Sequence, residues 1–251
     1  MKPLCIDIFA GLGGWSAGFL AEGYDCVGFD IERHVYGDMH YPAQLVLQDA
    51  LTIHGKQFKD AACIVCSPPC QFFSYCAMPW TRAKALAAEV RSDPVRLAKE
   101  LALFNACFRI QREATEAAGR HIPMVVENVR WAIPWVGRSR GNFGSYHLWG
   151  DVPALMPPTQ TIGTKRPGMN WSGSDKPGYV AKAFNDTSGI TGHWTNPDEN
   201  GTEQGGDWFA AEGSISRTTG SKSTKRKAAS ALIAKIPETL SRHIARTYLP
   251  R

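Results

Sequence analysis

The chain has 251 residues and a mass of 27.6 kDa, the size of one large domain or of one domain with a small additional lobe. Hydrophobic residues make up 43% and charged residues 20%, which is typical of folded proteins and not of disordered chains. No apolar stretch approaches the roughly 18 residues of a membrane span. The N-terminus lacks the basic lead and cleavage site of a secretory signal, and seven cysteines without such a signal indicate free thiols in a reducing compartment.

The charge is unevenly distributed along the chain. The net charge is +5, but residues 214–251 alone carry 9 basic residues and one acidic residue, whereas acidic residues outnumber basic ones over residues 1–60. A polyanionic partner such as nucleic acid would therefore meet the C-terminal part. A solvated helix end with a basic tail is the alternative interpretation.

Short apolar runs predict strands, and longer periodic runs predict helices. Strands are expected over residues 4–9, 24–29, 45–47, 62–66 and 123–126, and a first helix over residues 15–22. The clearest helix begins after Ser92 or Asp93, has Pro94 in its first turn and ends at Gly119. Its apolar stripe is formed by Leu97, Leu101, Phe104 and Phe108.

Strands that alternate with helices predict an α/β fold, a Rossmann-like, mostly parallel sheet with helices on both faces. In such sheets the functional crevice lies beyond the carboxyl ends of the strands. The glycine and polar residues that end the predicted strands are Gly11 to Gly14, Asp30, Asp49, Cys70 and Glu127. We therefore expect the functional site at that edge of the sheet.

Three segments differ in composition. Residues 1–150 carry the alternating pattern and are expected to form the catalytic and cofactor-binding domain. Residues 151–225 are rich in glycine and proline, show no helical or strand period, and are expected to form a small loop-rich lobe. Helical spacing returns over residues 226–251, with a break at Pro237, which indicates a helical segment that rejoins the first domain.

A glycine-rich loop follows the first predicted strand. Asp7-Ile8-Phe9-Ala10-Gly11-Leu12-Gly13-Gly14 lets the backbone approach a ligand closely. Ser16 stands where the dinucleotide fingerprint requires a third glycine, so a nicotinamide cofactor is not favoured. Asp30 could accept hydrogen bonds from ribose hydroxyls and Asp49 could accept one from an adenine amino group, which favours a nucleoside ligand without a pyrophosphate. A tight packing turn with two surface acids is the alternative.

The segment Cys66-Ser67-Pro68-Pro69-Cys70-Gln71 follows the fourth predicted strand. Two prolines fix the backbone, so Cys70 is expected to be held rigidly beside the crevice as a nucleophilic thiolate. A metal site built from the nearby cysteines is the rival interpretation. It is disfavoured because Cys63 and Cys66 fall on opposite faces of a strand and no second ligand pair follows, so no metal is expected. Small buried side chains are the expected role of Cys5, Cys26, Cys63 and Cys107.

Glu127-Asn128-Val129 ends the fifth predicted strand. A carboxyl group there could bind a ring nitrogen and an exocyclic amine together, which is the edge that cytosine presents. A helix-capping acid is the alternative.

These segments together resemble the DNA (cytosine-5) methyltransferase family. The glycine loop is similar to its first motif, Ser67-Pro68-Pro69-Cys70-Gln71-x-x-Ser74 to its Pro-Cys motif, and Glu127-Asn128-Val129 to its Glu-Asn-Val motif. The resemblance implies the class I S-adenosylmethionine-dependent methyltransferase fold. It also implies S-adenosylmethionine as the donor and a cytosine flipped out of double-stranded DNA as the acceptor. A monomer in the cytoplasm of a bacterial or phage-infected cell is expected.

The resemblance also implies roles for individual residues. Cys70 would be the nucleophile, and Glu127 would bind the cytosine at N3 and at its amino group. The residues that would line the cofactor site are Phe9, Gly11, Leu12, Gly13, Asp30, Ile31, Asp49 and Pro69. Gln71 and Ser74 would face DNA and begin a mobile loop from Phe72 to roughly Ala88. The DNA phosphates would be contacted by Lys222, Lys225, Arg226 and Lys227.

Later family motifs match less well. Arg138-x-Arg140 has the internal spacing of the arginine motif that contacts the cytosine O2, but Val136 stands where the family has glutamine. Ala234-Lys235-Ile236-Pro237 stands in place of the C-terminal Gly-Asn…Val-Pro motif. Three other functions stay open: an RNA cytosine-5 methyltransferase, a catalytically inactive DNA-binding relative, and an enzyme that methylates an exocyclic amine. Cys70 argues against the last of these.

Overall fold

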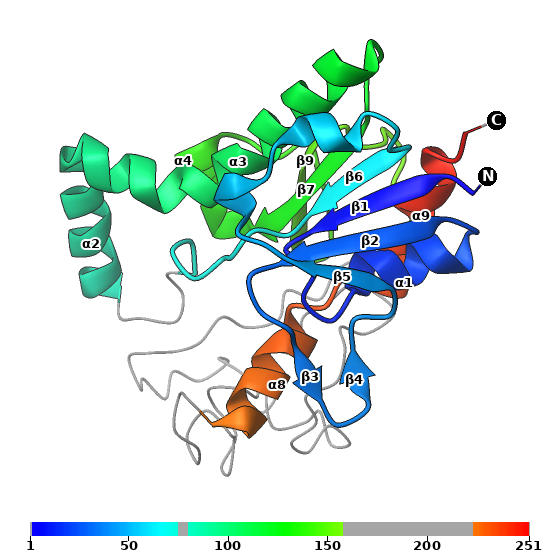
Figure 1. Ribbon diagram of the computed structural model, residues 1–251. Helices are drawn as coiled ribbons and strands as arrows, with labels where there is room; N and C mark the ends of the chain where they lie inside the picture. Colours follow the sequence, from blue (N-terminus) through cyan, green and yellow to red (C-terminus); the bar gives the residue numbers. More distant parts are fainter. Residues whose placement is uncertain (1, 75–79, 158–222, 251) are drawn as a thin grey trace.

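The computed structural model describes residues 2–74, 80–157 and 223–250 (Figure 1). Its centre is a seven-stranded sheet with the order β5-β2-β1-β6-β7-β9-β8. The strands are β1 (Leu4–Ile8), β2 (Asp25–Asp30), β5 (Gln44–Leu47), β6 (Cys63–Cys66), β7 (Met124–Val129), β8 (Gly141–Phe143) and β9 (Tyr146–Gly150). The first five strands in this order run parallel, and β9 runs antiparallel to both of its neighbours.

Helices cover both faces of the sheet, as the alternating pattern predicted (Figure 1). One face packs against α3 (Pro94–Ala118) and the short 3₁₀ turns η1 (Ala50–Thr52) and η2 (Gly55–Phe58). The opposite face packs against α1 (Gly14–Ala21) and α9 (Glu238–Thr247). The mostly parallel sheet with helices on both faces is therefore confirmed.

The long helix begins and ends where its capping residues predicted. The Asp93 side chain accepts hydrogen bonds from the backbone amides of Val95 and Arg96, both at 3.0 Å. Gly119 ends the helix in the left-handed conformation, with φ of 63°. The middle of the predicted stripe faces the sheet, because Phe104 is buried and Leu101 and Phe108 pack against the same core.

The buried cysteines alternate between the two faces of the sheet. Cys63 belongs to the core beside α1 and α9, whereas Cys66 belongs to the core beside α3. Their odd separation on one strand places them on opposite faces, as predicted. Cys5, Cys26 and Cys107 are also buried side chains of these two cores. Among the described residues, no three His, Cys, Asp or Glu side chains come together as a possible metal site.

The structure contains elements that the sequence patterns did not predict. A two-stranded hairpin, β3 (Val35–Tyr36) and β4 (Met39–His40), lies between β2 and β5, and β8 with β9 forms a second hairpin. Their strands have two to five residues, too short to show a period. Two further short elements, η4 (Arg130–Ala132) and α4 (Ile133–Val136), follow β7.

The predicted loop from Phe72 to Ala88 is wrong in its second half. Helix α2 (Trp80–Ser92) begins at Trp80 and includes the alanine-rich run of residues 83–88. Alanine has the highest intrinsic helix propensity, so this run favours a helix, whereas the loop was expected from the family resemblance alone. Residues 75–79 lie outside the described part of the chain.

The C-terminal helices return to the first domain, with the predicted break at Pro237. They are α8 (Thr224–Ile233) and α9, and α9 packs along α1. Residues 158–222 of the predicted lobe lie outside the described residues, so the three-segment division stays a prediction. None of the described helices is long and apolar enough to span a membrane.

The contact between α1 and α9 depends on one glycine. A Cβ atom placed on Gly18 would lie 2.3 Å from the Ser241 Oγ and 2.7 Å from the Arg242 backbone nitrogen. The Ser241 hydroxyl also donates a hydrogen bond to the Trp15 carbonyl on α1. The two helices can therefore approach this closely only because residue 18 has no side chain.

Gly18→Val should push α9 away from α1 and lower the free energy of unfolding by about 3 kcal/mol, as overpacking does in other cores. Ala21→Val is the matched control, because Ala21 is exposed on the same helix. This substitution should lower the free energy of unfolding only by the lower helix propensity of a β-branched residue, under about 1 kcal/mol. Urea unfolding of both variants measures the difference. Equal losses in the two variants would contradict close helix packing as the constraint.

Candidate active site

A cavity of about 500 Å³ lies beyond the carboxyl ends of β1, β2, β5 and β6. This is the edge at which the sequence predicted the functional site. Its size falls in the range of small-molecule pockets, roughly 300–1,000 Å³. Seven of the eight predicted cofactor residues line it: Phe9, Gly11, Leu12, Asp30, Ile31, Asp49 and Pro69.

The glycine loop forms one wall in a strained conformation. Phe9 has a φ of 63°, the one positive φ among the described non-glycine residues, and Gly11 and Gly13 have φ values of 50° and 71°. The Phe9 and Ala10 amides both donate to the Phe29 carbonyl, which holds the loop against β2. Backbone strain of this kind persists only where surrounding contacts enforce it, and it is common at ligand sites.

Gly13 does not line the cavity. It caps α1, and a Cβ atom at this position would lie 2.3 Å from the Pro42 Cδ. The missing side chain is therefore required for packing against the segment before β5. Gly13 is therefore not exposed to the cavity, and its predicted role as a cofactor residue stays a prediction.

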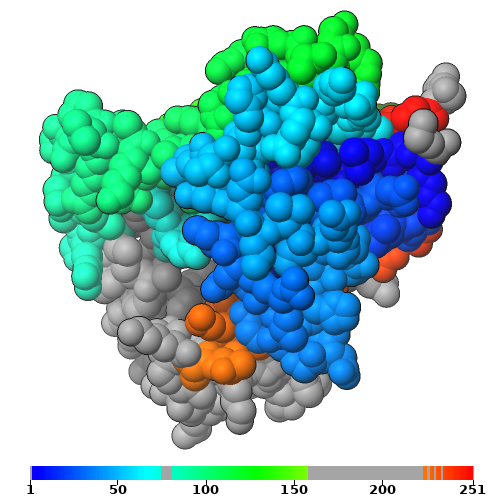
Figure 2. Space-filling view, viewed as in Figure 1, coloured from blue at the N-terminus to red at the C-terminus, as the bar shows by residue number. Residues whose placement is uncertain are grey.

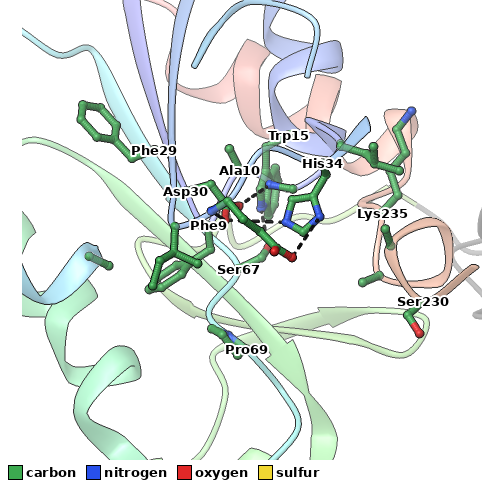
Figure 3. Close-up of a pocket in the computed structure, with 18 of the residues that line it drawn as sticks. Phe9, Ala10, Trp15, Phe29, Asp30, His34, Ser67, Pro69, Ser230 and Lys235 are labelled. Atoms are coloured by element: carbon green, nitrogen blue, oxygen red, sulfur yellow. Dashed lines mark hydrogen bonds and ion pairs between the residues drawn. The ribbon is translucent and has the colours of Figure 1, made fainter. Parts of the chain in front are cut away.

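Asp30 is fixed at the centre of this wall. Its Oδ2 accepts a hydrogen bond from the Gly11 amide at 2.9 Å, and its Oδ1 accepts one from the Glu32 amide at 3.2 Å. His34 lies beside it, with Nε2 3.7 Å from Oδ1 (Figure 3). Burial alone would raise the pKa of Asp30, but the interactions with His34 and the two amides outweigh this and lower it. The same contact raises the pKa of His34 above its ordinary value.

Asp49 lies at the adjacent strand end and also lines the cavity. Its Oδ1 accepts a hydrogen bond from the Leu51 amide at 2.9 Å and so caps η1. Ile31, which follows Asp30 in the chain and also lines the cavity, is 74% exposed. A cavity lined by an exposed apolar side chain and two carboxylates suits a flat ring whose edges carry donors.

The far wall comes from the C-terminal segment, which the sequence did not assign to this site. Helix α8 lies against the N-terminal part of the protein, beside the β3–β4 hairpin (Figures 1 and 2). Its cavity-lining residues Lys227, Ser230 and Ala231 share one helical face, and Ala234 follows directly after the helix. Lys235 and Ile236 follow in the turn (Figure 3). The spacing of three, four and seven residues, with small side chains, was a signal that could have indicated a packed face.

Lys227 was predicted to contact DNA phosphates, but it lines the cavity. Lys222 lies outside the described residues, as do the side chains of Lys225 and Arg226. Other cavity residues that sequence reasoning missed are Trp15, His34, Tyr36, Ser67 and Gln48. Only the folded sheet and hairpin bring these separated positions together.

Cys70 lies where β6 ends, between two cavity-lining residues, Pro69 and Gln71. Pro68 is buried and Pro69 is exposed, while Cys70 is half-buried in a tight turn. Its carbonyl accepts hydrogen bonds from the Phe73 amide and from the Ser74 hydroxyl, both at 2.9 Å. Ser74 thus stabilises the turn that carries Cys70, in addition to its predicted place on the DNA side.

Glu127 lies on the neighbouring strand and is only 8% exposed. Strands β6 and β7 pair in parallel with Cys66 opposite Val126, so both strands deliver their polar ends to one edge. Asn128 joins the two ends, because its Nδ2 donates to the Pro68 carbonyl at 2.8 Å. The two segments that resemble family motifs are therefore in direct contact.

The predicted arginines are elsewhere. Arg138 and Arg140 are exposed and do not line the cavity. The Arg140 amide donates to the Leu148 carbonyl, and Leu148 pairs with Glu127 across β9. Arg140 therefore directly precedes β8, β9 lies between β8 and the Glu127 strand, and a role for either arginine stays a prediction.

Comparison with known proteins adds one family match. Residues 4–82 match the family model described as C-5 cytosine-specific DNA methylase. The resemblance predicted from the motifs is therefore confirmed over these residues. The matched segment includes the glycine loop, Asp30, Asp49 and Cys70 and ends before Glu127. A search of curated proteins found no match.

Two solved structures show weak similarity. One is described as a putative DNA modification methyltransferase encoded within a prophage of E. coli, with 20% identity over 53% of this chain and 33% of that chain. The other is the Entamoeba histolytica methyltransferase EhMeth, with 15% identity over 55% of this chain and 41% of that chain. Both TM-scores are 0.33, so these likenesses carry no argument about function. The chain spans between a third and two fifths of the length of these proteins.

A buried acid lies on the strand that precedes the glycine loop and bonds to the helix that follows the loop. Asp7 on β1 is 1% exposed and accepts a hydrogen bond from the Ser16 Oγ at 2.7 Å, and that hydroxyl lies 2.6 Å from the Tyr41 hydroxyl. Burial raises the pKa of Asp7 to about 7, although the hydrogen bonds from Ser16 oppose this. In the folded protein Asp7 therefore holds its proton at mildly acidic pH, where an unfolded chain has lost it.

The stability contributed by neutral Asp7 should be lost as pH rises from about 4 to about 7, because the folded state binds the proton and the unfolded state does not. Asp7→Asn should remove this part of the pH dependence, since an amide stays neutral throughout. Asp25→Asn is the control, because that carboxylate is exposed on the adjacent strand. Urea unfolding between pH 5 and 8 measures both, and parallel curves for Asp7→Asn and the unmodified protein would contradict the raised pKa.

Proposed function

We propose that this protein transfers a methyl group from S-adenosylmethionine to carbon 5 of cytosine in DNA through a covalent adduct with Cys70. The observation that carries the proposal is the position of Cys70. Its chain neighbours Pro69 and Gln71 line the nucleoside-sized cavity, and it follows the strand that pairs with the Glu127 strand. The family match over residues 4–82 supports the same chemistry.

The residues of the cavity fit the proposed cofactor. A glycine loop, an acid after each of two adjacent strands, and an exposed isoleucine line the cavity and suit an adenosine group without a phosphate. Asp30 would accept hydrogen bonds from the ribose hydroxyls, and Asp49 one from the adenine amino group. When bound, this cofactor supplies an electrophilic methyl group on a positively charged sulfur.

Cys70 would act on the target base. Its thiolate would attack carbon 6 of cytosine, and the electron pair of the 5,6 double bond would make carbon 5 nucleophilic enough to take the methyl group. The bond from the methyl group to sulfur would break, and the neutral thioether S-adenosylhomocysteine would leave. Carbon 5 then loses its proton to solvent or a nearby base, the double bond re-forms, and the bond from carbon 6 to sulfur breaks to release the thiolate. The base must leave the DNA stack to reach the thiol.

Glu127 would hold the cytosine during this attack. Burial of a carboxyl group disfavours its charged form, so a buried carboxyl can donate to N3 of the ring. Its second oxygen can accept a hydrogen bond from the exocyclic amine. Hydrogen bonding at N3 draws electron density from the ring and makes carbon 6 more electrophilic.

Cys70→Ala should abolish methyl transfer and leave the affinity for S-adenosylhomocysteine within about twofold, because the cavity walls remain. Cys76→Ala, which removes a second thiol from the same segment, is the control and should keep its activity. The measurement is transfer of labelled methyl groups to DNA, with nucleoside digestion to locate the label, and covalent capture on DNA that contains 5-fluorocytosine.

Normal turnover by the Cys70 variant would exclude the covalent mechanism. Label on the exocyclic amine would instead indicate an amine methyltransferase. Transfer to tRNA but not to DNA, assayed in parallel, would indicate the RNA enzyme. Binding to DNA without transfer or capture would indicate an inactive relative.

Asp30→Ala should weaken S-adenosylhomocysteine binding by about tenfold or more, because a charged hydrogen bond to the ligand contributes on the order of 1.5–3 kcal/mol. Asp38→Ala is the control, since Asp38 is exposed and does not line the cavity. Isothermal titration calorimetry measures both affinities. Unchanged affinity in Asp30→Ala would place the nucleoside elsewhere.

A further inference from the structure

A cluster of aromatic rings connects the turn that carries Cys70 with two helices outside the cavity. The Phe72 and Trp135 ring centroids are 4.9 Å apart with an interplanar angle of 64°, an edge-to-face arrangement. Phe72 also contacts Phe73 at 5.2 Å, and Phe73 contacts Phe104 of α3 at 6.3 Å. The guanidinium carbon of Arg91, at the end of α2, lies 4.7 Å from the centre of the Trp135 ring.

The two phenylalanines hold the turn in different ways. Phe73 is 1% exposed and belongs to the core beneath α3, so it anchors the turn to the fixed part of the fold. Phe72 is only partly buried, and its neighbours include Trp135. Because the Phe73 amide donates to the Cys70 carbonyl, Cys70 and both rings belong to one hydrogen-bonded turn. A displacement of Phe72 would therefore move the thiol.

Trp135 is supplied by α4, soon after the Glu127 strand ends. Its ring contacts Phe72 from the Cys70 turn and Arg91 from α2, so it joins three segments at one point. Most of α2 is exposed, and Ala83 and Val90 are its buried side chains among those described. The contact between Arg91 and Trp135 links this helix to the turn through Trp135 and Phe72. A cation over an aromatic face is an attractive contact even at partly exposed sites.

We propose that Trp135 is a positioning residue for Cys70, which it acts on through Phe72, and that Arg91 holds the Trp135 ring in place. This inference rests on the proposed function, in which Cys70 is the nucleophile. A nucleophile must be held within about 0.5 Å of its productive position. Two prolines fix the chain before Cys70, and the aromatic contacts fix the chain after it.

Trp135→Ala should slow covalent capture on 5-fluorocytosine DNA by about tenfold or more at saturating DNA and cofactor, because small misplacements of reacting groups have large effects on rate. S-adenosylhomocysteine affinity should stay within about twofold, since Trp135 does not line the cavity. Trp135→Phe should recover most of the rate by keeping a ring against Phe72. Arg91→Lys should keep more of the rate than Arg91→Met, which removes the cation at similar length.

A second measurement does not depend on catalysis. Alkylation of Cys70 by iodoacetamide, assigned by tandem mass spectrometry without DNA or cofactor, should be faster in Trp135→Ala, because loosening the turn exposes a half-buried thiol. If the unmodified protein captures no DNA but this difference is present, the proposed function fails and the positioning role holds. Unchanged alkylation and capture in Trp135→Ala would overturn the inference, as would a parallel loss of cofactor affinity.

Discussion

The parallel alignment of β1, β2, β6 and β7 is the constraint on which the site depends. Parallel strands end at the same edge of a sheet, so the residues that follow each strand meet there although they are far apart in the sequence. Two hydrogen bonds lock this edge. The Gly11 backbone amide donates to the Asp30 carboxylate across β1 and β2, and the Asn128 side-chain amide donates to the Pro68 carbonyl across β6 and β7. The first shapes the cavity, and the second joins the Cys70 and Glu127 segments.

The cavity shows how strain and burial are distributed around a site. The left-handed Phe9 backbone costs free energy and is held by the β2 carbonyl that both loop amides bind. Beneath the loop, Asp7 is buried at a further cost, which its contact with Ser16 reduces. Both features lie beside the surface that we assign to the cofactor. Burial of the large apolar cores on either side of the sheet stabilises the fold and offsets the free-energy costs of the Phe9 backbone and the buried Asp7.

The reactive cysteine is held by contacts of two kinds. Before it, the buried Pro68 is fixed by ring geometry and by Asn128, which leaves little freedom to the backbone. After it, Phe73 enters the core and Phe72 packs on Trp135. The buried cysteines have no comparable access, and burial raises the pKa values of Cys5, Cys63 and Cys66 further from the reactive range. Position therefore distinguishes Cys70 from the other described thiols.

The sequence by itself determined the parallel sheet, the capped long helix, the glycine loop and the position of Cys70 after a strand, because these depend on local periodicity, capping and backbone restriction. It did not determine the short hairpins, whose strands are too short to show a period. It also did not determine α2, which lies where the family resemblance implied a loop. Only the tertiary structure decided that α8 lines the cavity, that Lys227 lies at the cavity and that Trp135 contacts Phe72. These contacts join residues that are distant along the chain, and burial of a shared apolar surface, which no local pattern encodes, brings them together.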